Sequence, residues 1–305
     1  MKIVSVINYK GGVGKTTLTA NLGAYAASQG KRVLLIDLDP QTHLTFNFIK
    51  PTEWKDRYAA DKTLHNYLEP ITKSSDDVVP LSEFVIQVRA GDKTLDIISS
   101  HLNLINSEVD LASMAAGATI PMLAANSLKT YSYLRNGLQE LQDSYDLCLI
   151  DCPPNFNVLV KNALLASNYY FIPTKLDYLS TDLGISNLQS SIASFMKQYD
   201  EYRDIINDRK YLPVFLSVLG VVPMMVNYLK DDKLYNVQDE YKDKLQKKGY
   251  RIFSHVRNNP TMFGTEPQVG VPVVLTSPKF YQKTQRKVVD ELKQLGEEFI
   301  NAVKL

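Results

Sequence analysis

The N-terminal segment constrains the fold most strongly, because it combines an apolar run, a glycine-rich turn, a helical pattern and a second apolar run. Ile3 to Ile7 is the first run, and YKGGVGKTT follows it. Thr16 to Ser28 then has apolar residues at helical spacing, and Gly30 is placed as a helix stop. Val33 to Ile36 is the second run. This order predicts a βαβ unit, in which a crossover helix joins two parallel strands.

Short runs rich in Val, Ile and Leu recur along the chain and are followed by turn residues and helical patterns, which is typical of buried parallel strands. The further predicted strands are Leu95 to Ile98, Leu147 to Ile150, Tyr169 to Ile172 and Val214 to Val222. Helices are predicted over Val237 to Arg251 and, with an apolar stripe, over Thr284 to Leu305. The predicted fold class is α/β, a mostly parallel twisted β-sheet flanked by helices on both faces.

We expect residues 1–305 to form a single domain, because the sequence contains no repeat and no low-complexity linker. The segment of about 48–92 is polar and is interrupted by Pro51, Pro70 and Pro80. It is therefore predicted to be an irregular insertion of loops and short helices at the edge of the sheet.

The charges are balanced, with 34 Lys and Arg against 33 Asp and Glu and a formal net charge of +1. Any surface that attracts nucleic acid must therefore be local. Cys148 and Cys152 are too few for a disulfide framework and lack metal-site spacing with His, which favours buried thiols in a reducing cytoplasm. No signal peptide precedes the first run, and no stretch approaches the roughly 18 apolar residues of a membrane span, so we expect a soluble cytoplasmic protein.

The glycine-rich turn is a candidate phosphate cradle. Glycines let main-chain N–H groups converge on phosphate oxygens, and the start of the helix adds a favourable dipole. Lys15 would reach the β- and γ-phosphates, and the Thr16 hydroxyl would be a ligand of Mg²⁺. The pattern departs from GxxxxGK[ST], since Tyr9 stands at the position of the first glycine and a second lysine, Lys10, follows it. The predicted cradle residues are Gly11, Gly12, Val13, Gly14, Lys15 and Thr16.

Two later predicted strands end in carboxylates. VLLIDLDPQ contains Asp37 and Asp39, and LCLIDCPP contains Asp151, which is typical of a Walker B aspartate. The carboxyl ends of parallel strands meet at the edge where open α/β sheets bind ligands. One carboxylate of the first pair could hold Mg²⁺ through water, and the other could orient a water for attack on the γ-phosphate. The alternative for each motif taken alone is an Asp that forms a turn or caps a strand.

Together these motifs resemble the ParA/MinD family of deviant Walker A P-loop ATPases. The resemblance rests on KGGVGKTT from Lys10 to Thr17, DLDPQ from Asp37 to Gln41 and DCPP from Asp151 to Pro154. Weaker similarity continues through IPTKLDYLSTDLGISNL, GVVPMM and RNNPTMFGTEPQVGVPV, so it covers most of the chain outside the insertion. The chain is most similar to the small ParA (Soj-like) partition ATPases, because its first strand starts at residue 2 and leaves no room for an N-terminal DNA-reading domain.

The resemblance implies roles for single residues. In the family two subunits clamp two ATP molecules face to face, and the signature lysine of each subunit crosses to the phosphates of the other. Lys10 would be that lysine, and its charge would stabilise the transferring phosphoryl group. The implied catalytic residues are Lys10, Lys15 and Asp39, of which Asp39 positions the hydrolytic water. The further implied contacts are Thr17 to the α-phosphate, Met225 to the adenine, and Thr16, Asp37 and Asp151 to the Mg²⁺ shell.

The resemblance also implies an ATPase that positions DNA or cargo. Its ATP-bound homodimer would bind DNA without sequence preference, and a ParB-like or other cargo adaptor would stimulate hydrolysis to ADP and phosphate and so release it. We expect the ATP state to associate with the nucleoid, in plasmid partition or chromosome segregation. KFYQKTQRK supplies candidate DNA contacts, because it contains basic residues and no acidic one. These residues are Lys279, Lys283, Arg286 and Lys287.

Two alternatives remain open from the sequence. A MinD-like membrane-associated ATPase would end in a basic amphipathic helix, but the terminal helix here contains Glu291, Glu297 and Glu298 beside its lysines, so no stable membrane association is expected. A P-loop metabolic kinase or ligase would use the insertion as a small-molecule pocket, and Lys10 argues against this alternative.

Overall fold

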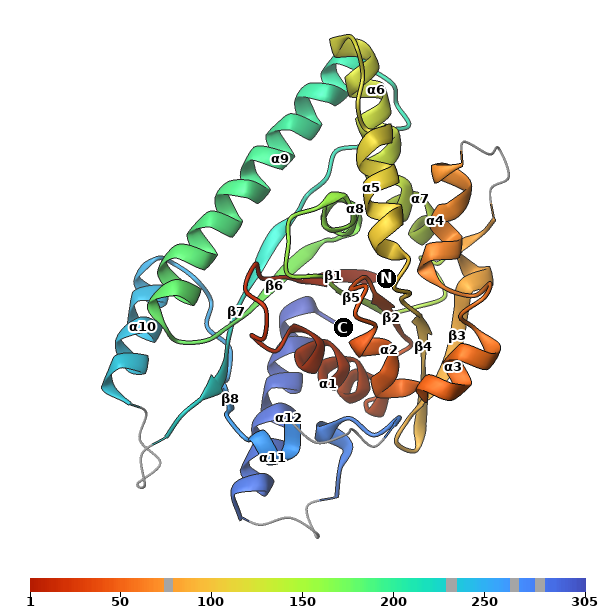
Figure 1. Cartoon of the computed structure of the whole chain (residues 1–305). Helices are drawn as coiled ribbons and strands as arrows, with labels where there is room; N and C mark the ends of the chain where they lie inside the picture. Colours follow the sequence, from red (N-terminus) through yellow and green to blue (C-terminus); the bar gives the residue numbers. More distant parts are fainter. Residues whose placement is uncertain (74–78, 229–234, 264–268, 278–282) are drawn as a thin grey trace.

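A computed structural model of the chain describes residues 1–73, 79–228, 235–263, 269–277 and 283–305 (Figure 1). The centre of this part of the chain is an eight-stranded sheet in the order β3-β4-β2-β5-β1-β6-β7-β8. All neighbouring strands are parallel except β3 and β4. The strands are β1 Lys2–Val6, β2 Val33–Asp37, β3 Val85–Ala90, β4 Lys93–Ile98, β5 Leu147–Asp151, β6 Tyr169–Thr174, β7 Ser217–Val226 and β8 Val256–Arg257.

Helices cover both faces of the sheet, which explains why the central strands are apolar without interruption. Alternate side chains of one strand enter two different cores: Ile3 packs on the side of the helices between residues 64 and 206, and Val4 on the side of the helices at 15–28, 43–48 and 283–303 (Figure 1). The predicted α/β class is thus confirmed. The helices are α1 Lys15–Ser28, α2 His43–Phe48, α3 Pro51–Arg57, α4 Leu64–Thr72, α5 Leu104–Met114, α6 Ile120–Tyr131, α7 Tyr133–Gln139, α8 Val158–Ala166, α9 Ile185–Ile206, α10 Asn236–Lys247, α11 Pro260–Phe263 and α12 Lys283–Val303. Shorter helical segments are η1 Leu81–Phe84, η2 Leu179–Gly184 and η3 Val273–Leu275.

The terminal helix α12 packs on the sheet and on α1, as its apolar stripe predicts. The ring of Phe299 lies 5.7 Å from that of Phe171 on β6. Gly296 lies against Tyr25 of α1, where a Cβ atom would approach the tyrosine ring to 2.4 Å, so the two helices are in close contact. The stripe residues Val288, Leu292, Leu295, Phe299 and Val303 are all buried.

The prediction for the seventh strand was wrong at both ends, because β7 spans Ser217–Val226 and not Val214 to Val222. The residues before it lie outside the sheet, and Phe215 is 85% exposed. The strand continues through Pro223, which is buried and lies in register with Thr174 of β6. Met225 near its end has a positive φ of 56°, and the pairing with β8 shifts at this point.

The insertion is more regular than predicted. Two of its segments are short helices, α3 and α4, as expected, but Val85–Ala90 forms strand β3, antiparallel to β4. The sequence VIQVRA alternates buried and exposed side chains, which is the pattern of a half-exposed edge strand. Gly91, with a φ of 67°, makes the turn into β4. Pro51 begins α3, Pro70 lies inside α4 and Pro80 directly precedes η1, so the prolines interrupt neither the helices nor the edge strand.

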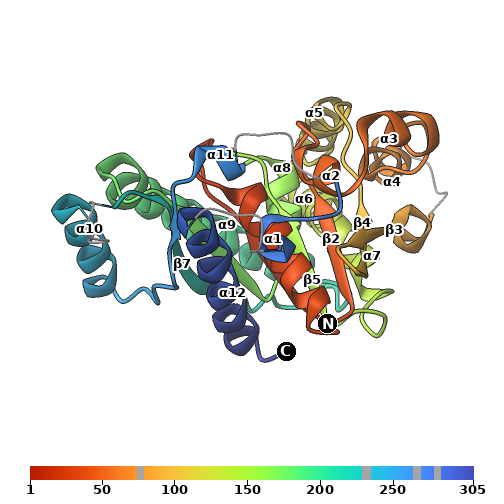
Figure 2. The ribbon, with the colours of Figure 1, turned by 90° about the horizontal axis from the view of Figure 1, so that it is seen from below.

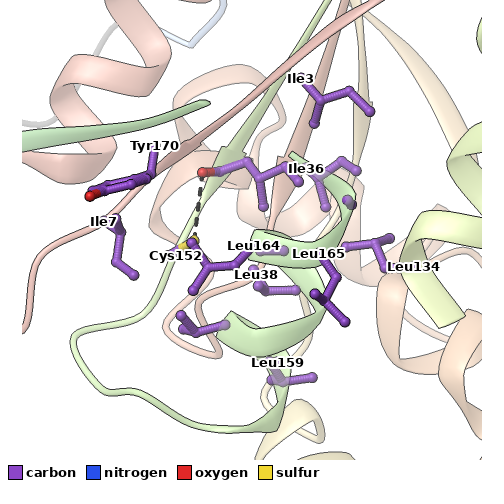
Figure 3. Close-up of a cluster of buried hydrophobic side chains, with 14 of the residues drawn as sticks. Ile3, Ile7, Ile36, Leu38, Leu134, Cys152, Leu159, Leu164, Leu165 and Tyr170 are labelled. Carbon is purple, nitrogen blue, oxygen red and sulfur yellow. Dashed lines mark hydrogen bonds between the residues drawn. The ribbon is translucent and has the colours of Figure 1, made fainter. Parts of the chain in front are cut away.

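Both cysteines are free and fully buried, as predicted. Figure 3 shows Cys152 among apolar side chains that include Leu159 and Leu164, with its Sγ 3.9 Å from the carbonyl oxygen of Ile150. Burial raises the pKa of both thiols above the ordinary range. Throughout the described ranges, no helix is both long and apolar enough to cross a membrane.

Candidate nucleotide-binding site

The glycine-rich turn connects β1 to α1 at the carboxyl edge of the sheet. Gly12 and Gly14 have φ angles of 67° and 90°, a conformation that favours glycine. Gly14 also lies against β7, since a Cβ atom there would be 3.0 Å from Met224 Cε. Gly11 is exposed, whereas Val13 is fully buried and anchors the turn. The N-cap residue of α1 is Gly14, which has no side chain to bond the first turn, so the main-chain N–H groups of this turn can bind an anion.

Lys15 is buried at the start of α1 and points back into the turn. Its ammonium donates to the main-chain oxygens of Asn8 at 3.3 Å and Lys10 at 3.4 Å. Burial lowers the pKa of Lys15, whereas the negative charge of Asp151 acts to raise it. The turn itself is held by Asn8, which the sequence did not single out: its side chain accepts from the Lys10 N–H and donates to the Pro173 oxygen.

Asp37 and Asp151 lie side by side, because they are paired in register on the neighbouring strands β2 and β5. Asp151 accepts hydrogen bonds from Thr16 Oγ1 at 2.6 Å and Thr19 Oγ1 at 3.3 Å. Asp37 accepts from the main-chain N–H and the hydroxyl of Thr45. The site therefore has two fully buried carboxylates and a hydroxyl at the foot of the phosphate turn.

Burial destabilises the charge of both carboxylates, and the charge of Asp151 further destabilises that of Asp37. Burial raises the pKa of Asp151 to about 7, and burial together with the charge of Asp151 raises the pKa of Asp37 well above its usual range. A divalent cation would remove this repulsion. The donor set of carboxylate and hydroxyl oxygens is the one that a hard cation such as Mg²⁺ prefers.

Asp39 differs from Asp37 although it follows only two residues later. Its carboxylate is partly buried and accepts from the Gln41 N–H at 3.0 Å, while its main-chain oxygen accepts from Ser100 Oγ at 2.6 Å. Asp37 is fixed by Thr45, whereas Asp39 lies on the turn that follows the strand. The two residues thus have different environments, as the sequence predicted for a strand end.

Lys10 points away from Lys15 and contacts the loop after β6. Its ammonium lies 3.3 Å from both carboxylate oxygens of Asp177 and donates to Ser180 Oγ at 2.9 Å. Asp177 also accepts from the N–H and the hydroxyl of Ser180. The sequence did not assign roles to Asp177 and Ser180; the available signal was the position of Asp177 just after a strand that ends at the same edge.

Thr17 and Met225 lie at the two ends of the candidate site. Thr17 is half-exposed in the first turn of α1. Met225 is half-buried at the end of β7, next to a cavity of about 600 Å³ that starts at Val226. The cavity contains amide side chains that the sequence did not single out, and two pairs are linked: Asn258 donates to Asn227 Oδ1, and the Asn227 N–H donates to Gln238 Oε1. Such amides can bind the edge of a nucleotide base.

The candidate DNA residues are only partly described. Lys279 lies outside the described residues, and Lys283, Arg286 and Lys287 belong to the first two turns of α12. Arg286 is exposed. Lys244 of α10 and Lys248, just after that helix, are also basic, but both form ion pairs with Asp182 of η2.

The turn, the buried lysine and the carboxylates at one sheet edge define a P-loop nucleotide-binding protein. The family described as an AAA domain matches residues 1–205. Soj of Bacillus subtilis, a sporulation initiation inhibitor protein, is 27% identical over 91% of this chain and 92% of its own. ParA of Caulobacter vibrioides, a chromosome partitioning protein, is 27% identical over 95% and 94%. The fold matches the ATP complex of McdA from Cyanothece with a TM-score of 0.69, over 100% and 97% of the two chains at 19% identity.

The chain belongs to this AAA-domain family and is a ParA/MinD-type P-loop ATPase. The resemblance in its sequence motifs is thereby confirmed. The family match ends at residue 205, but the similarity to Soj and ParA extends beyond it and covers more than nine tenths of the chain.

Proposed function

We propose that the chain is a positioning ATPase that binds ATP and Mg²⁺, forms a homodimer, and hydrolyses ATP to ADP and phosphate. The observation that supports it most is the buried pair Asp37 and Asp151 beside Lys15 and Thr16. Gly11 to Thr17 would hold the phosphates through their N–H groups, and Lys15 would neutralise the β- and γ-phosphates. The amide-rich cavity after Met225 would receive the adenine.

Thr16, Asp37 and Asp151 would hold Mg²⁺, which neutralises phosphate charge when it is bound. Asp39 would orient the attacking water, because its carboxylate lies at the site edge and is not committed to Thr45 as that of Asp37 is. Attack of this water on the γ-phosphorus breaks the bond to the bridging oxygen, and ADP and inorganic phosphate leave. In this scheme Lys10 would act on the nucleotide of a second copy, after it leaves Asp177.

The ATP-bound dimer would bind DNA without sequence preference, through basic residues at the start of α12. A ParB-like or other cargo adaptor would stimulate hydrolysis and release the dimer, so that the ATP state associates with the nucleoid in the cytoplasm. This cycle is supported by the similarity to proteins of chromosome partitioning. The buried stripe of α12 argues against a MinD-like membrane anchor in that helix, because its apolar face already packs on the sheet.

Gel filtration with Mg²⁺ and ATP or ADP tests the proposal. Asp39→Ala should block turnover and give dimers with ATP and monomers with ADP. Asp204→Ala, an exposed carboxylate on α9, is the matched control and should retain hydrolysis. If Asp39→Ala stays monomeric at saturating ATP, the sandwich dimer is wrong. Release of inorganic phosphate separates the ATPase from a P-loop kinase or ligase, which would transfer the phosphoryl group to an acceptor.

A further inference from the structure

Two adjacent serines follow strand β4 and contact different parts of the molecule. Ser99 and Ser100 are both fully buried. The Ser99 hydroxyl donates to the Lys62 main-chain oxygen at 3.2 Å and accepts from the Trp54 indole N–H at 3.3 Å, so it contacts the insertion. Ser100 instead contacts the turn that follows β2, the strand that pairs with β4. The two serines therefore have different partners although they are neighbours in the chain.

The Ser100 hydroxyl holds the turn that contains Asp39. It donates to the Asp39 main-chain oxygen at 2.6 Å, and this oxygen also accepts from the Thr42 N–H at 2.9 Å. Pro40, the next residue, restricts the main chain of Asp39 further. Thr42 has a φ of 61°, which is unfavourable for a β-branched residue. The turn thus contains a strained residue and is fixed to β4 by the Ser100 hydroxyl.

The carboxylate of Asp39 has little support of its own. Among the residues that the structure describes, its one hydrogen-bond donor is the Gln41 N–H at 3.0 Å, in the same turn. By contrast, the carboxylate of Asp37 is held by both the N–H and the hydroxyl of Thr45. The direction of the Asp39 side chain is therefore set by its main chain, which Ser100 fixes.

The N–H of Ser100 is linked to Asp37 through Thr45. It donates to Thr45 Oγ1 at 3.1 Å, and the hydroxyl and N–H of Thr45 donate to Asp37 Oδ2 at 2.7 and 2.8 Å. Thr45 is fully buried in α2, and Figure 2 shows α2 and α5 at the edge of the molecule opposite both chain termini. Ser100 is thus bonded, directly or through Thr45, to both acidic residues at the end of β2.

From these contacts we infer that Ser100 is a positioning residue for ATP hydrolysis. Its hydroxyl holds the Asp39 carboxylate in the direction that the attacking water requires, so it acts through Asp39 and not on the nucleotide. The inference rests on the proposed function, in which Asp39 orients that water. A reacting group displaced by about 1 Å reacts far more slowly. Loss of the hydroxyl should therefore slow the reaction of bound ATP and leave its binding intact.

The kinetics of phosphate release test this role. Ser100→Ala removes the hydroxyl, while the Asp39 main-chain oxygen keeps the Thr42 N–H as a donor. The variant should lower kcat by about tenfold and leave the KM for ATP and the Mg²⁺ concentration at half-maximal rate within about twofold. Ser99→Ala is the matched control, because it removes a hydroxyl from the neighbouring and equally buried residue, and it should retain kcat.

Hydrogen exchange of the nucleotide-free protein tests the structural step without any measurement of activity. In Ser100→Ala the Thr42 N–H should exchange severalfold faster, because the oxygen that it binds is no longer fixed to β4. Ser99→Ala should leave this exchange unchanged. Ser100→Thr keeps a hydroxyl at this position and should restore both the slow exchange and kcat to within about twofold of the unmodified chain.

These measurements separate the inference from the proposed function. If the unmodified chain releases no phosphate from ATP, both are wrong. If it does, and Ser100→Ala keeps its kcat or fails to fold, the inference is wrong and the proposed function stands. The same holds if Ser99→Ala or Ser100→Thr loses as much kcat as Ser100→Ala. Unchanged exchange of the Thr42 N–H, or a KM for ATP that rises as kcat falls, would show that Ser100 does not position Asp39.

Discussion

The ammonium of Lys10 lies 3.3 Å from both carboxylate oxygens of Asp177 and donates to the hydroxyl of Ser180 in the same chain. The lysine that is proposed to act on a second copy is thus held within its own subunit. The proposed dimer requires this ammonium to leave Asp177 and to reach a phosphate of the second copy. The contact is a candidate latch on the monomer.

Removal of the latch should favour the dimer. Asp177→Ala should lower the ATP concentration at half-maximal dimerisation, by up to about fivefold, because a partly exposed ion pair contributes at most about 1 kcal/mol. Light scattering during an ATP titration measures this midpoint. Asp182→Ala, which removes ion pairs with Lys244 and Lys248 and leaves Lys10 untouched, is the control. An unchanged or raised midpoint for Asp177→Ala would show that the contact is no latch.

The buried carboxylates should make the nucleotide-free protein less stable at high pH. The folded protein holds a proton on Asp151 up to a pKa of about 7, whereas the unfolded chain releases it near the ordinary value of 3.8. Between these values the folded state binds more protons, so the free energy of unfolding falls as pH rises. Asp37 contributes in the same direction. Urea unfolding in EDTA should show greater stability at pH 5 than at pH 8.

Replacement of Asp151 by asparagine should flatten this pH profile. At pH 8 Asp151→Asn should have a higher free energy of unfolding than the unmodified protein. For a pKa of about 7 the difference is at most about 4 kcal/mol, and it should vanish near pH 4. Asp146→Asn is the opposite control, because hydrogen bonds from Arg32 lower the pKa of Asp146 to about 2. A profile for Asp151→Asn that runs parallel to that of the unmodified protein would contradict the assignment.

The conformation of the phosphate turn can be tested with two glycines. Gly14→Ala should abolish ATP binding and destabilise the protein by about 1–2 kcal/mol, because its φ of 90° is unfavourable for alanine and its Cβ would press on Met224. Gly11→Ala is the matched control, since no atom of the described residues lies within 4 Å of its added Cβ and the fold should keep its stability. Thermal unfolding with and without ATP measures both effects. Equal losses in the two variants would argue against the described turn.

The DNA proposal predicts a specific change in salt dependence. In the ATP-trapped dimer, Arg286→Ala should weaken binding to DNA duplexes of unrelated sequence by the same factor. It should also reduce the slope of log affinity against log salt concentration by about 1 for each phosphate that the protein no longer neutralises. Lys293→Ala, an exposed lysine further along α12, should have a smaller effect. Fluorescence anisotropy at several salt concentrations measures the slope. Sequence-selective binding, or none, would remove this part of the proposal.

Local patterns in the sequence were enough to predict which residues meet at the carboxyl edge of the sheet. The turn from Lys10 to Thr16 and the carboxylates of Asp37 and Asp151 are identified by the apolar runs before them, because parallel strands bring their carboxyl ends to one edge. The edge strand β3 was missed because prolines in the same segment suggested an irregular insertion throughout. Its alternating sequence was the available signal.

Contacts between distant segments could not be predicted from local patterns. Lys10 and Asp177 are 167 residues apart, and their pairing depends on β1 and β6 being neighbours in the sheet. Helix α5 shows the same limit, because its sequence alone does not show that Leu104 and Leu111 are buried while Ile105 and Val109 are exposed. Packing against α4 and α8 determines which side of α5 is buried, and both of these helices are separated from α5 in the chain by other elements.

The structure of Asp39→Ala with Mg²⁺ and ATP tests the central claim most directly. It should contain a two-fold dimer in which Lys10 has left Asp177 and its ammonium lies within hydrogen-bond distance of a phosphate bound to the partner. A nucleotide-bound structure in which Lys10 still pairs with Asp177 of its own chain, and no phosphate of a second copy is near it, would contradict the claim.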